Sequence, residues 1–306
     1  MSRRFRADAS LVLATILWGA TFVVVKDALD HASVFVFLAL RFALATVLMA
    51  LIFRRAVRQL TRSEVRAGAL IGALLFAGYV LQTSGLLYTT PSKAAFITGF
   101  GVVLVPILSA VFWRRRINHW VWAGAAAALV GLYFLTVPSQ GLTELNRGDL
   151  LTLGCAVVFA LHIIVVGRYS GRHPVGALSF LQVATTGALT VFALPLLAVT
   201  GLEPLRLDWS PSLLLAVLIT AVFATAIAFS VQVWAQQYTT PTHTAIIFTL
   251  EPVFAALTSY LVLSERLGAR ALSGAALILA GILLAELKGP AQAAADSPGP
   301  VSGSSV

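Results

Sequence analysis

The chain has 306 residues, of which 59% are hydrophobic and only 11% are charged. Soluble proteins carry about 25% charged residues, so this composition excludes an ordinary soluble enzyme or binding domain and indicates an integral membrane protein. The excess of 21 Lys and Arg over 12 Asp and Glu is spread over the connections between apolar runs, and no soluble basic domain exists that could bind nucleic acid.

Ten apolar stretches, each close to the roughly 20 residues that a helix needs to cross a bilayer, predict ten membrane-spanning helices. They lie near 10–26, 33–53, 67–87, 93–113, 119–137, 149–167, 176–199, 212–235, 243–263 and 269–287. The basic segment 1–9 is not followed by a small-residue cleavage site, so we expect a cytoplasmic N-terminus and a retained first span rather than a signal peptide. Residues 288–306 are rich in Pro, Gly, Ser and Ala, which predicts a disordered cytoplasmic tail.

The sequence Tyr-Thr-Thr-Pro occurs twice, at 88–91 and at 238–241, and the register of 150 residues extends well beyond these four positions. It predicts an internal duplication, with a first five-helix repeat over 10–137 and a second over 149–287. Because five is an odd number, the second repeat enters the membrane upside down. Inverted repeats of this kind are typical of secondary transporters, which bind substrate at the interface between the repeats.

The distribution of basic residues predicts the orientation. With the N-terminus inside, the inner segments hold fourteen Lys and Arg residues and the outer segments hold six. Cytoplasmic loops carry the excess of these residues, so both termini are expected to be cytoplasmic.

Polar and aromatic side chains within the spans are the first candidates for a substrate-binding cavity. In the third span Tyr79, Gln82 and Thr83 share one helix face, and in the eighth span Gln232 and Trp234 lie at comparable depth. Amides both donate and accept hydrogen bonds, which suits a zwitterionic or hydroxylated substrate, and the aromatic rings would supply apolar walls and cation–π contacts. Alternatively, the glutamines tie helices together and the aromatic residues lie at the membrane interface.

The first and sixth spans align at a different spacing of 141 residues, which matches Thr21 with His162 and Arg41 with Gln182. Thr21 and the nearby Trp18 are further candidates for substrate binding. His162 lies in mid-span and could titrate near neutral pH, coupling transport to protons. The pattern favours the simpler alternative, a histidine with one hydrogen-bond partner inside the bundle.

Arg41 and Glu251 are the two ionisable residues that lie deepest in predicted spans. A charge in the bilayer core costs at least about 2.5 kcal/mol, so each requires a partner or water. They are predicted either to form an ion pair that joins the second and ninth spans, which we favour, or to line the cavity separately. Glu251 precedes Pro252, which can kink the helix and free a backbone carbonyl, so this carboxyl is also a candidate for proton coupling.

The two Tyr-Thr-Thr-Pro turns lie at opposite membrane surfaces in this topology. Their hydroxyls could gate the cavity or cap the helices that follow, and we expect capping. Glycines such as Gly124 and Gly131 are predicted to permit close helix contacts.

The sequence lacks the motifs of nucleotide-hydrolysing and metal-binding proteins. It has no Gly-x-x-x-x-Gly-Lys phosphate loop and no Cys/His cluster with metal-ligand spacing. We therefore expect no catalytic residues, no cofactor and no metal site. Cys155 is the one cysteine, so an intrachain disulfide is excluded. The expected partners are a small-molecule substrate, membrane lipid and, if transport is coupled, protons; the chain is expected to act as a monomer or a weak homodimer.

Short motifs in both halves carry a resemblance to a known family. They are Trp18-Gly19 with Lys26, Leu40-Arg41-Phe42, Leu250-Glu251-Pro252-Val253-Phe254, Glu265-Arg266-Leu267, and Gly274 with Gly281. In their order and spacing over residues 10–287, they resemble the EamA family of the drug/metabolite transporter superfamily. The first half departs from the pattern, with Gly101-Val102 in place of Glu251-Pro252 and Arg115 in place of Glu265.

The resemblance implies a ten-helix exporter of small metabolites in the bacterial inner (cytoplasmic) membrane. It implies amino acids as the leading substrate class, including those of an aromatic amino-acid exporter subgroup, while more distant relatives carry nucleotide sugars or sugar phosphates. A carrier of other metabolites or drugs, a channel and a non-transporting membrane scaffold remain as alternatives.

Overall fold

The computed structural model describes residues 2–89, 91–113, 117–137, 146–201, 203–263 and 268–288. Within these ranges the chain is almost entirely helical and has no named strand, which confirms the predicted all-α membrane fold. Seven helices are long and apolar enough to cross a membrane, and two shorter apolar helices accompany them in the same ranges. The elements are α1 (Arg3–His31), α2 (Val34–Ile52), α3 (Arg54–Arg58), α4 (Arg62–Leu86), α5 (Pro91–Thr98), α6 (Gly101–Trp113), α7 (His119–Thr136), α8 (Arg147–Tyr169), α9 (Val175–Thr200), α10 (Pro211–Ala221), the π-helix η1 (Val222–Ile227), α11 (Ala228–Ala235), α12 (Pro241–Phe248), α13 (Glu251–Leu263) and α14 (Ala269–Lys288).

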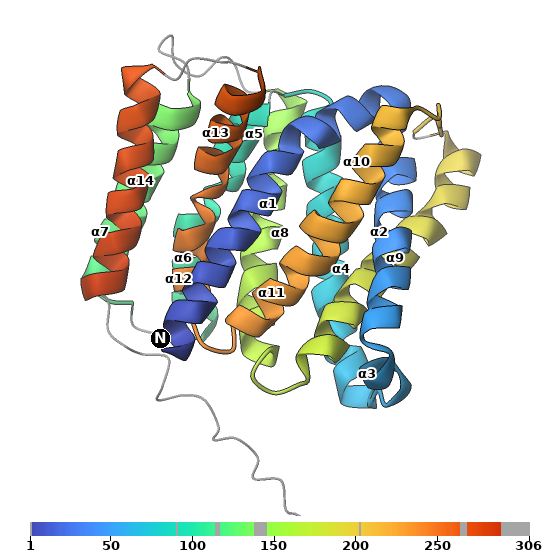
Figure 1. The fold of residues 1–306 in the computed structure, drawn as a ribbon, viewed down its shortest axis with the longest axis horizontal. Helices are drawn as coiled ribbons and strands as arrows, with labels where there is room; N and C mark the ends of the chain where they lie inside the picture. Colours follow the sequence, from blue (N-terminus) through green and yellow to red (C-terminus); the bar gives the residue numbers. More distant parts are fainter. Residues whose placement is uncertain are drawn as a thin grey trace, which may run out of the picture.

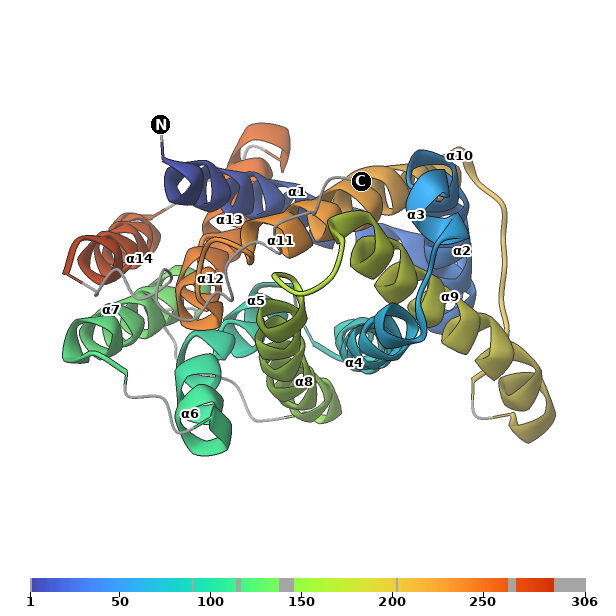
Figure 2. The same cartoon turned by 90° about the horizontal axis from the view of Figure 1, so that it is seen from below.

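The long helices run side by side between two faces of the molecule (Figure 1). We call the face at which α1 begins the N-terminal face; it also holds α3 and the connections from α8 to α9 and from α11 to α12. The other face is called the opposite face. Seen along the helices, α7 and α14 lie at one end of the molecule and α2 and α9 lie at the other (Figure 2). Between these ends α4 packs against α8, and α1 packs against α11 and α13.

The first helix is longer than the sequence predicts. It begins at Arg3 rather than near residue 10, because the Ser2 hydroxyl accepts a hydrogen bond from the backbone N–H of Phe5 at 3.2 Å and caps the helix. Residues 3–9 of the segment that was predicted to be the cytoplasmic N-terminus therefore form the first turns of α1.

Three predicted spans are locally irregular. The span at 93–113 is divided into α5 and α6, and the span at 243–263 is divided at the matching position into α12 and α13. The span at 212–235 contains the π-helix η1. In the sequence, Pro252 indicated an irregularity in the span at 243–263, and no pattern predicted the other two interruptions. Residues 264–267, which include Glu265 and Arg266, and the predicted tail from residue 289 onward lie outside the described residues.

Glycines bring α7 and α14 into backbone contact. A Cβ added at Gly131 would lie 2.6 Å from the carbonyl oxygen of Gly274, and one at Gly124 would lie 2.6 Å from the carbonyl oxygen of Gly281. Since real side chains do not approach so closely, only glycine fits at these positions. The predicted role of these glycines in close helix contacts is confirmed.

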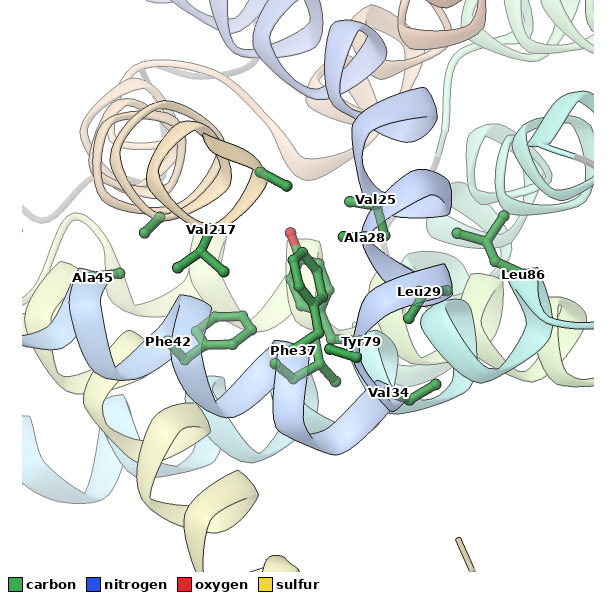
Figure 3. Packing of buried hydrophobic residues seen from close by; sticks show 14 of the residues in the cluster. Val25, Ala28, Leu29, Val34, Phe37, Phe42, Ala45, Tyr79, Leu86 and Val217 are labelled. Atoms are coloured by element: carbon green, nitrogen blue, oxygen red, sulfur yellow. The ribbon is translucent and has the colours of Figure 1, made fainter. Parts of the chain in front are cut away.

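The largest apolar core surrounds α2. Phe37 and Phe42 are fully buried, and they pack with Val25 of α1, Val217 of α10 and Tyr79 of α4 (Figure 3). Tyr79 is the polar member of this core, so its hydroxyl requires a partner.

Candidate functional site

A cavity of about 120 Å³ lies where the interrupted helices meet α1, α4 and α8. Gly99 and Gly101 of the α5–α6 junction line one side, and Thr249 and Glu251 of the α12–α13 junction line another. Nine of the ten residues predicted to form the site border this cavity. They are Trp18, Thr21, Arg41, Tyr79, Gln82, Thr83, His162, Gln232 and Glu251.

The cavity wall is built largely from residues at equivalent positions in the two halves of the chain. At a spacing of 150 residues, both members of several pairs line it: Gln82 and Gln232, Ala95 and Ala245, Gly99 and Thr249, Gly101 and Glu251, Val102 and Pro252. At a spacing of 141 residues, Trp18 is matched by Phe159 and Thr21 by His162. Residues from both halves of the chain therefore line the cavity.

Arg41 is buried on α2 and is held by three neutral oxygen atoms. Its Nε donates to Thr225 Oγ1 at 2.8 Å, and its Nη2 donates to the Tyr79 hydroxyl at 2.9 Å and to the Ala224 carbonyl oxygen at 3.4 Å. The guanidinium carbon also lies 4.5 Å from the centre of the Tyr79 ring, a cation–π distance. None of these partners neutralises the charge, so Arg41 presents a positive charge to the cavity.

Glu251 lies at the first position of α13, and its carboxyl forms no hydrogen bond or ion pair with any residue that the structure describes. Its backbone is fixed by α1, because a Cβ at Gly19 would lie 2.5 Å from the Glu251 carbonyl oxygen. A carboxylate is favourable at a helix N-terminus, and Pro252 fits the next position because it needs no N–H partner there. The sequence therefore places an acidic residue and a helix start together at the cavity.

The predicted ion pair between Arg41 and Glu251 is not formed. Both residues line the cavity, but Arg41 is bound by Thr225, Tyr79 and Ala224 instead. The physical reason is local: the π-helix η1 brings Thr225 Oγ1 to Nε of the guanidinium and the Ala224 carbonyl oxygen to Nη2.

The π-helix also holds Trp18. The indole Nε1 of Trp18 donates to the Ala224 carbonyl oxygen at 2.9 Å, so one carbonyl serves residues of both α1 and α2. In a π-helix the hydrogen-bond pattern shifts from i→i+4 to i→i+5, which leaves carbonyl oxygens available for side chains. Sequence reasoning missed Thr225; its signal is a hydroxyl group within a predicted membrane span.

Aromatic rings form the apolar part of the wall. The Trp18 ring lies 5.0 Å from Phe248 and 5.4 Å from Phe229, and the Tyr79 ring lies 5.6 Å from Phe159. These are edge-to-face or tilted arrangements at distances typical of stabilising aromatic pairs. The cavity thus combines one cationic group, one carboxyl group and a set of apolar rings.

His162 and Thr21 are matched in the repeat but differ in their contacts. His162 Nε2 lies 3.0 Å from Gln182 Oε1, which is a single side-chain hydrogen bond inside the bundle. Thr21 donates to the Trp18 carbonyl oxygen within its own helix at 2.9 Å. This geometry agrees with the simpler prediction for His162, a histidine with one partner.

The two glutamines also differ. Gln232 donates to Gln236 at 3.1 Å, and Gln236 donates in turn to the Ile163 carbonyl oxygen at 2.9 Å, which ties α11 to α8. Gln82 also lines the cavity, but it forms no such hydrogen bond between helices among the described residues. The sequence left two alternatives for the glutamines, lining the cavity or tying helices together, and Gln232 does both.

Trp234 does not line the cavity, which disagrees with its predicted position. Its ring lies 5.5 Å from Tyr238 and packs with an apolar cluster that includes Ala7 and Leu11. Residues two apart on a helix point about 200° apart, so a tryptophan at this position faces away from the cavity that Gln232 borders. The prediction matched Trp234 to the cavity by depth alone.

The Tyr-Thr-Thr-Pro turns have different contacts at the two faces. Thr240 accepts a hydrogen bond from the backbone N–H of His243 at 3.2 Å and caps α12, as predicted. Thr90, its counterpart, lies outside the described residues. The neighbouring Thr89 forms a side-chain hydrogen bond to Asp149 at 2.8 Å, which was not predicted.

Comparison with known proteins gives a consistent result. The model of the EamA-like transporter family matches residues 5–137 and 146–287. An uncharacterized transporter of Archaeoglobus fulgidus is 37% identical over 286 residues, which cover 94% of this chain and 87% of that protein. The threonine/homoserine exporter RhtA of Salmonella typhimurium is 28% identical over 249 residues, which cover 80% of this chain and 79% of that protein.

The fold also matches a solved structure. A crystal structure of another protein superposes with a TM-score of 0.75 at 21% identity, covering 92% of this chain and 97% of that one. At this identity the likeness concerns the fold alone.

Proposed function

Because the chain belongs to the EamA-like transporter family, we propose that it exports small metabolites, with amino acids as the leading class, by alternating access through the cavity. The observation that carries this proposal is the pairing of repeat-equivalent residues around a single cavity, such as Gln82 with Gln232 and Gly101 with Glu251. Broken helices at the interface of repeated halves are where secondary transporters bind their substrates.

The chemistry of the cavity supports a zwitterionic substrate. Arg41 supplies a positive charge without a carboxylate partner, and Glu251 supplies a carboxyl group without a hydrogen-bond partner among the described residues. The carboxylate and the ammonium group of an amino acid would satisfy both. The aromatic walls at Trp18 and Phe248 would contact its side chain. The name of the Salmonella relative, a threonine/homoserine exporter, is in line with this class.

The size of the cavity supports a compact substrate. A buried cavity of roughly 150 Å³ is large enough to bind a molecule such as benzene, and the volume here is about 120 Å³. A nucleotide sugar or another large ligand would require the cavity to widen considerably.

For an exporter, the orientation decides which face takes up the substrate and which face releases it. The surplus of Lys and Arg on the side of the N-terminus supports a cytoplasmic N-terminal face, with both termini inside and the protein in the cytoplasmic membrane of a bacterium. Substrate would enter the cavity from this face and leave through the opposite face. Glu251 would bind a proton in one state and release it in the other if export is proton-coupled.

Efflux from proteoliposomes tests the proposal. Vesicles would be loaded with a panel of radiolabelled amino acids, with sugar phosphates as a second panel, and efflux would be compared with protein-free vesicles. We expect saturable efflux of at least one small amino acid. Efflux no faster than from protein-free vesicles for every amino acid would refute this substrate class, and non-saturating flux would indicate a channel.

A further inference from the structure

A hydrogen bond joins the two halves of the chain at the opposite face. The Thr89 hydroxyl, just after α4, donates to Asp149 Oδ1 at the start of α8 at 2.8 Å. Asp149 is only 1% exposed. Glycines bring the two helices close together at this point, since a Cβ at Gly148 would lie 2.6 Å from the Gly85 carbonyl oxygen. We call the Thr89–Asp149 pair the opposite-face latch.

The duplicated register places the same two residue types at the N-terminal face. Thr89 corresponds to Thr239 at a spacing of 150 residues, and Asp149 corresponds to Asp8 at a spacing of 141 residues. The match extends to the neighbours of the acidic residue, because Arg-Ala-Asp at 6–8 aligns with Arg-Gly-Asp at 147–149.

The residues at which the two helices of each pair approach each other are also matched in the register. The partners of Gly148 and Gly85 in the register are Ala7 and Ala235, which are fully buried in one apolar cluster. Since α1 packs against α11 there, Asp8 and Thr239 flank the junction of these two helices. The N-terminal face therefore contains the components of a second latch.

This second latch is not closed in the structure. Thr239 Oγ1 is buried and has no hydrogen-bond partner among the residues that the structure describes, while Asp8 lies 3.6 Å from His243 Nε2 and 3.9 Å from Arg4 Nε. A buried hydroxyl without a partner is costly, and such groups in native structures call for an explanation. A partner in another conformation of the protein provides one.

We propose that Thr89–Asp149 and Thr239–Asp8 are alternating latches, one at each end of the cavity. In the present state the opposite-face latch is closed. When the carrier turns over, that bond breaks, Asp8 exchanges its contact with His243 for the Thr239 hydroxyl, and the N-terminal face closes instead. This inference rests on the alternating access of the proposed function. It identifies four residues outside the cavity that set the balance between the two states.

Side-specific cysteine labelling tests the latches without any substrate. Cys155 would be replaced by Ala to remove the one native cysteine, and Gly101→Cys, where an added Cβ meets no atom within 4 Å, would place a reporter in the cavity wall. A membrane-impermeant maleimide would then be applied to right-side-out and to inside-out membrane vesicles. The ratio of the two labelling rates reports which face is open.

The two threonine variants are expected to act in opposite directions. Thr89→Val removes a hydrogen bond from the present state, so labelling through the opposite face should rise about tenfold relative to labelling through the N-terminal face. Thr239→Val removes a bond from the other state, so the ratio should fall. The double variant should return towards the parent, and Thr89→Ser, which keeps the hydroxyl, should match the parent.

Thr152→Val is the matched control. Its hydroxyl is buried close to the latch on α8 but donates only within its own helix, to the Gly148 carbonyl oxygen at 2.7 Å. It should leave the labelling ratio unchanged. Unchanged ratios in Thr89→Val and Thr239→Val, or shifts in the same direction, would overturn the proposal. An inverted orientation of the protein would exchange the signs but preserve their opposition.

An engineered disulfide provides a second test if a valine variant fails to reach the membrane. In the variant that carries the reporter cysteine and lacks Cys155, Asp8→Cys with Thr239→Cys should form a reducible crosslink that blocks labelling of the reporter through the N-terminal face, and failure to crosslink would overturn the latch. These readouts need no transported substrate. A negative efflux panel would therefore count against the proposed substrates and leave this test intact.

Discussion

Arg41 and Tyr79 are joined by a hydrogen bond and by a cation–π contact. Arg41 Nη2 lies 2.9 Å from the Tyr79 hydroxyl, and the guanidinium carbon lies 4.5 Å from the centre of the Tyr79 ring. The tyrosine also touches Phe42, the residue after Arg41, at 5.1 Å between ring centres. Tyr79 therefore fixes the direction of the guanidinium while leaving its positive charge uncompensated. A fixed, uncompensated charge is what a cavity needs in order to bind an anionic group.

Tyr79→Phe should separate this orienting role from packing. The substitution keeps the ring and removes one hydrogen bond to a charged group, which is worth about 1.5–3 kcal/mol. We expect the apparent substrate affinity in the efflux assay to fall roughly tenfold or more, with little change in folding. Tyr169→Phe, on a ring that stacks on His173 far from Arg41, serves as the control and should transport like the parent.

Arg41→Lys tests the geometry of the charge itself. Lysine keeps the positive charge but cannot reproduce the planar, multidentate contacts of the guanidinium, which here reach Thr225, Tyr79 and Ala224. We expect a variant that folds and transports at least about tenfold more slowly. Transport at the parental rate would show that a point charge is sufficient and that the contacts with η1 are structural only.

Glu251→Gln tests proton coupling. The carboxyl faces the cavity without a partner among the described residues, whereas the amide of the variant cannot gain or lose a proton. If Glu251 carries the coupled proton, the variant should lose the dependence of export on pH between about 5.5 and about 8, and its downhill exchange should persist. Parental rates and parental pH dependence across this range would remove Glu251 as a coupling group.

Much of the candidate site could be predicted from the sequence because the duplication indicates which residues lie at the same depth in the membrane. Gln82 and Gln232 were matched by register, and both border the cavity. The approximate positions of the spans could be predicted because a bilayer demands long apolar helices. Arg41 and Glu251 stood out because charges are costly within such helices, although their contacts could not be deduced.

The remaining features depend on backbone hydrogen bonding, which leaves little trace in composition. The π-helix η1 differs from an α-helix only in the spacing of its hydrogen bonds, so the Ala224 carbonyl that binds Arg41 and Trp18 has no signature in its residue type. The interruption at Thr249 and Leu250 was equally hidden, although Pro252 pointed to a nearby irregularity. The predicted ion pair was wrong because η1 supplies the partners of Arg41.

The contact between α7 and α14 should be sensitive to any side chain. Gly131→Ala would place a Cβ 2.6 Å from the Gly274 carbonyl oxygen, and because the obstacle is backbone the two helices must move apart. We expect a loss of about 1–3 kcal/mol, seen as a lower Tm of the purified protein in detergent. Gly171→Ala, where no atom lies within 4 Å of the added Cβ, is the matched control and should leave Tm unchanged.

Glu203 should make the stability of the opposite face depend on pH. Its Oε1 accepts a hydrogen bond from the backbone N–H of Val34 at 2.6 Å and caps α2, where Ser33 provides no side-chain cap. Burial raises the pKa of the Glu203 carboxyl, and the N–H groups of Val34 and Phe35 oppose this only in part. The folded chain thus holds the proton on Glu203 more tightly than the unfolded chain does. Protonation of Glu203 therefore stabilises the folded chain at low pH, and this stabilisation is lost as the pH rises through the folded pKa.

Two variants of Glu203 separate the charge from the hydrogen bond. Glu203→Gln keeps an acceptor oxygen but has no charge to bury, so its Tm should exceed that of the parent at neutral pH, and the difference should vanish below about pH 3, where glutamate, with an ordinary pKa of about 4.3, is protonated in both states. Glu203→Ala removes the cap and should be less stable than Glu203→Gln at every pH, by about 1 kcal/mol. A Gln variant that is less stable than the parent at neutral pH would mean that the attraction of the carboxylate to the N-terminus of α2 outweighs the cost of burying it.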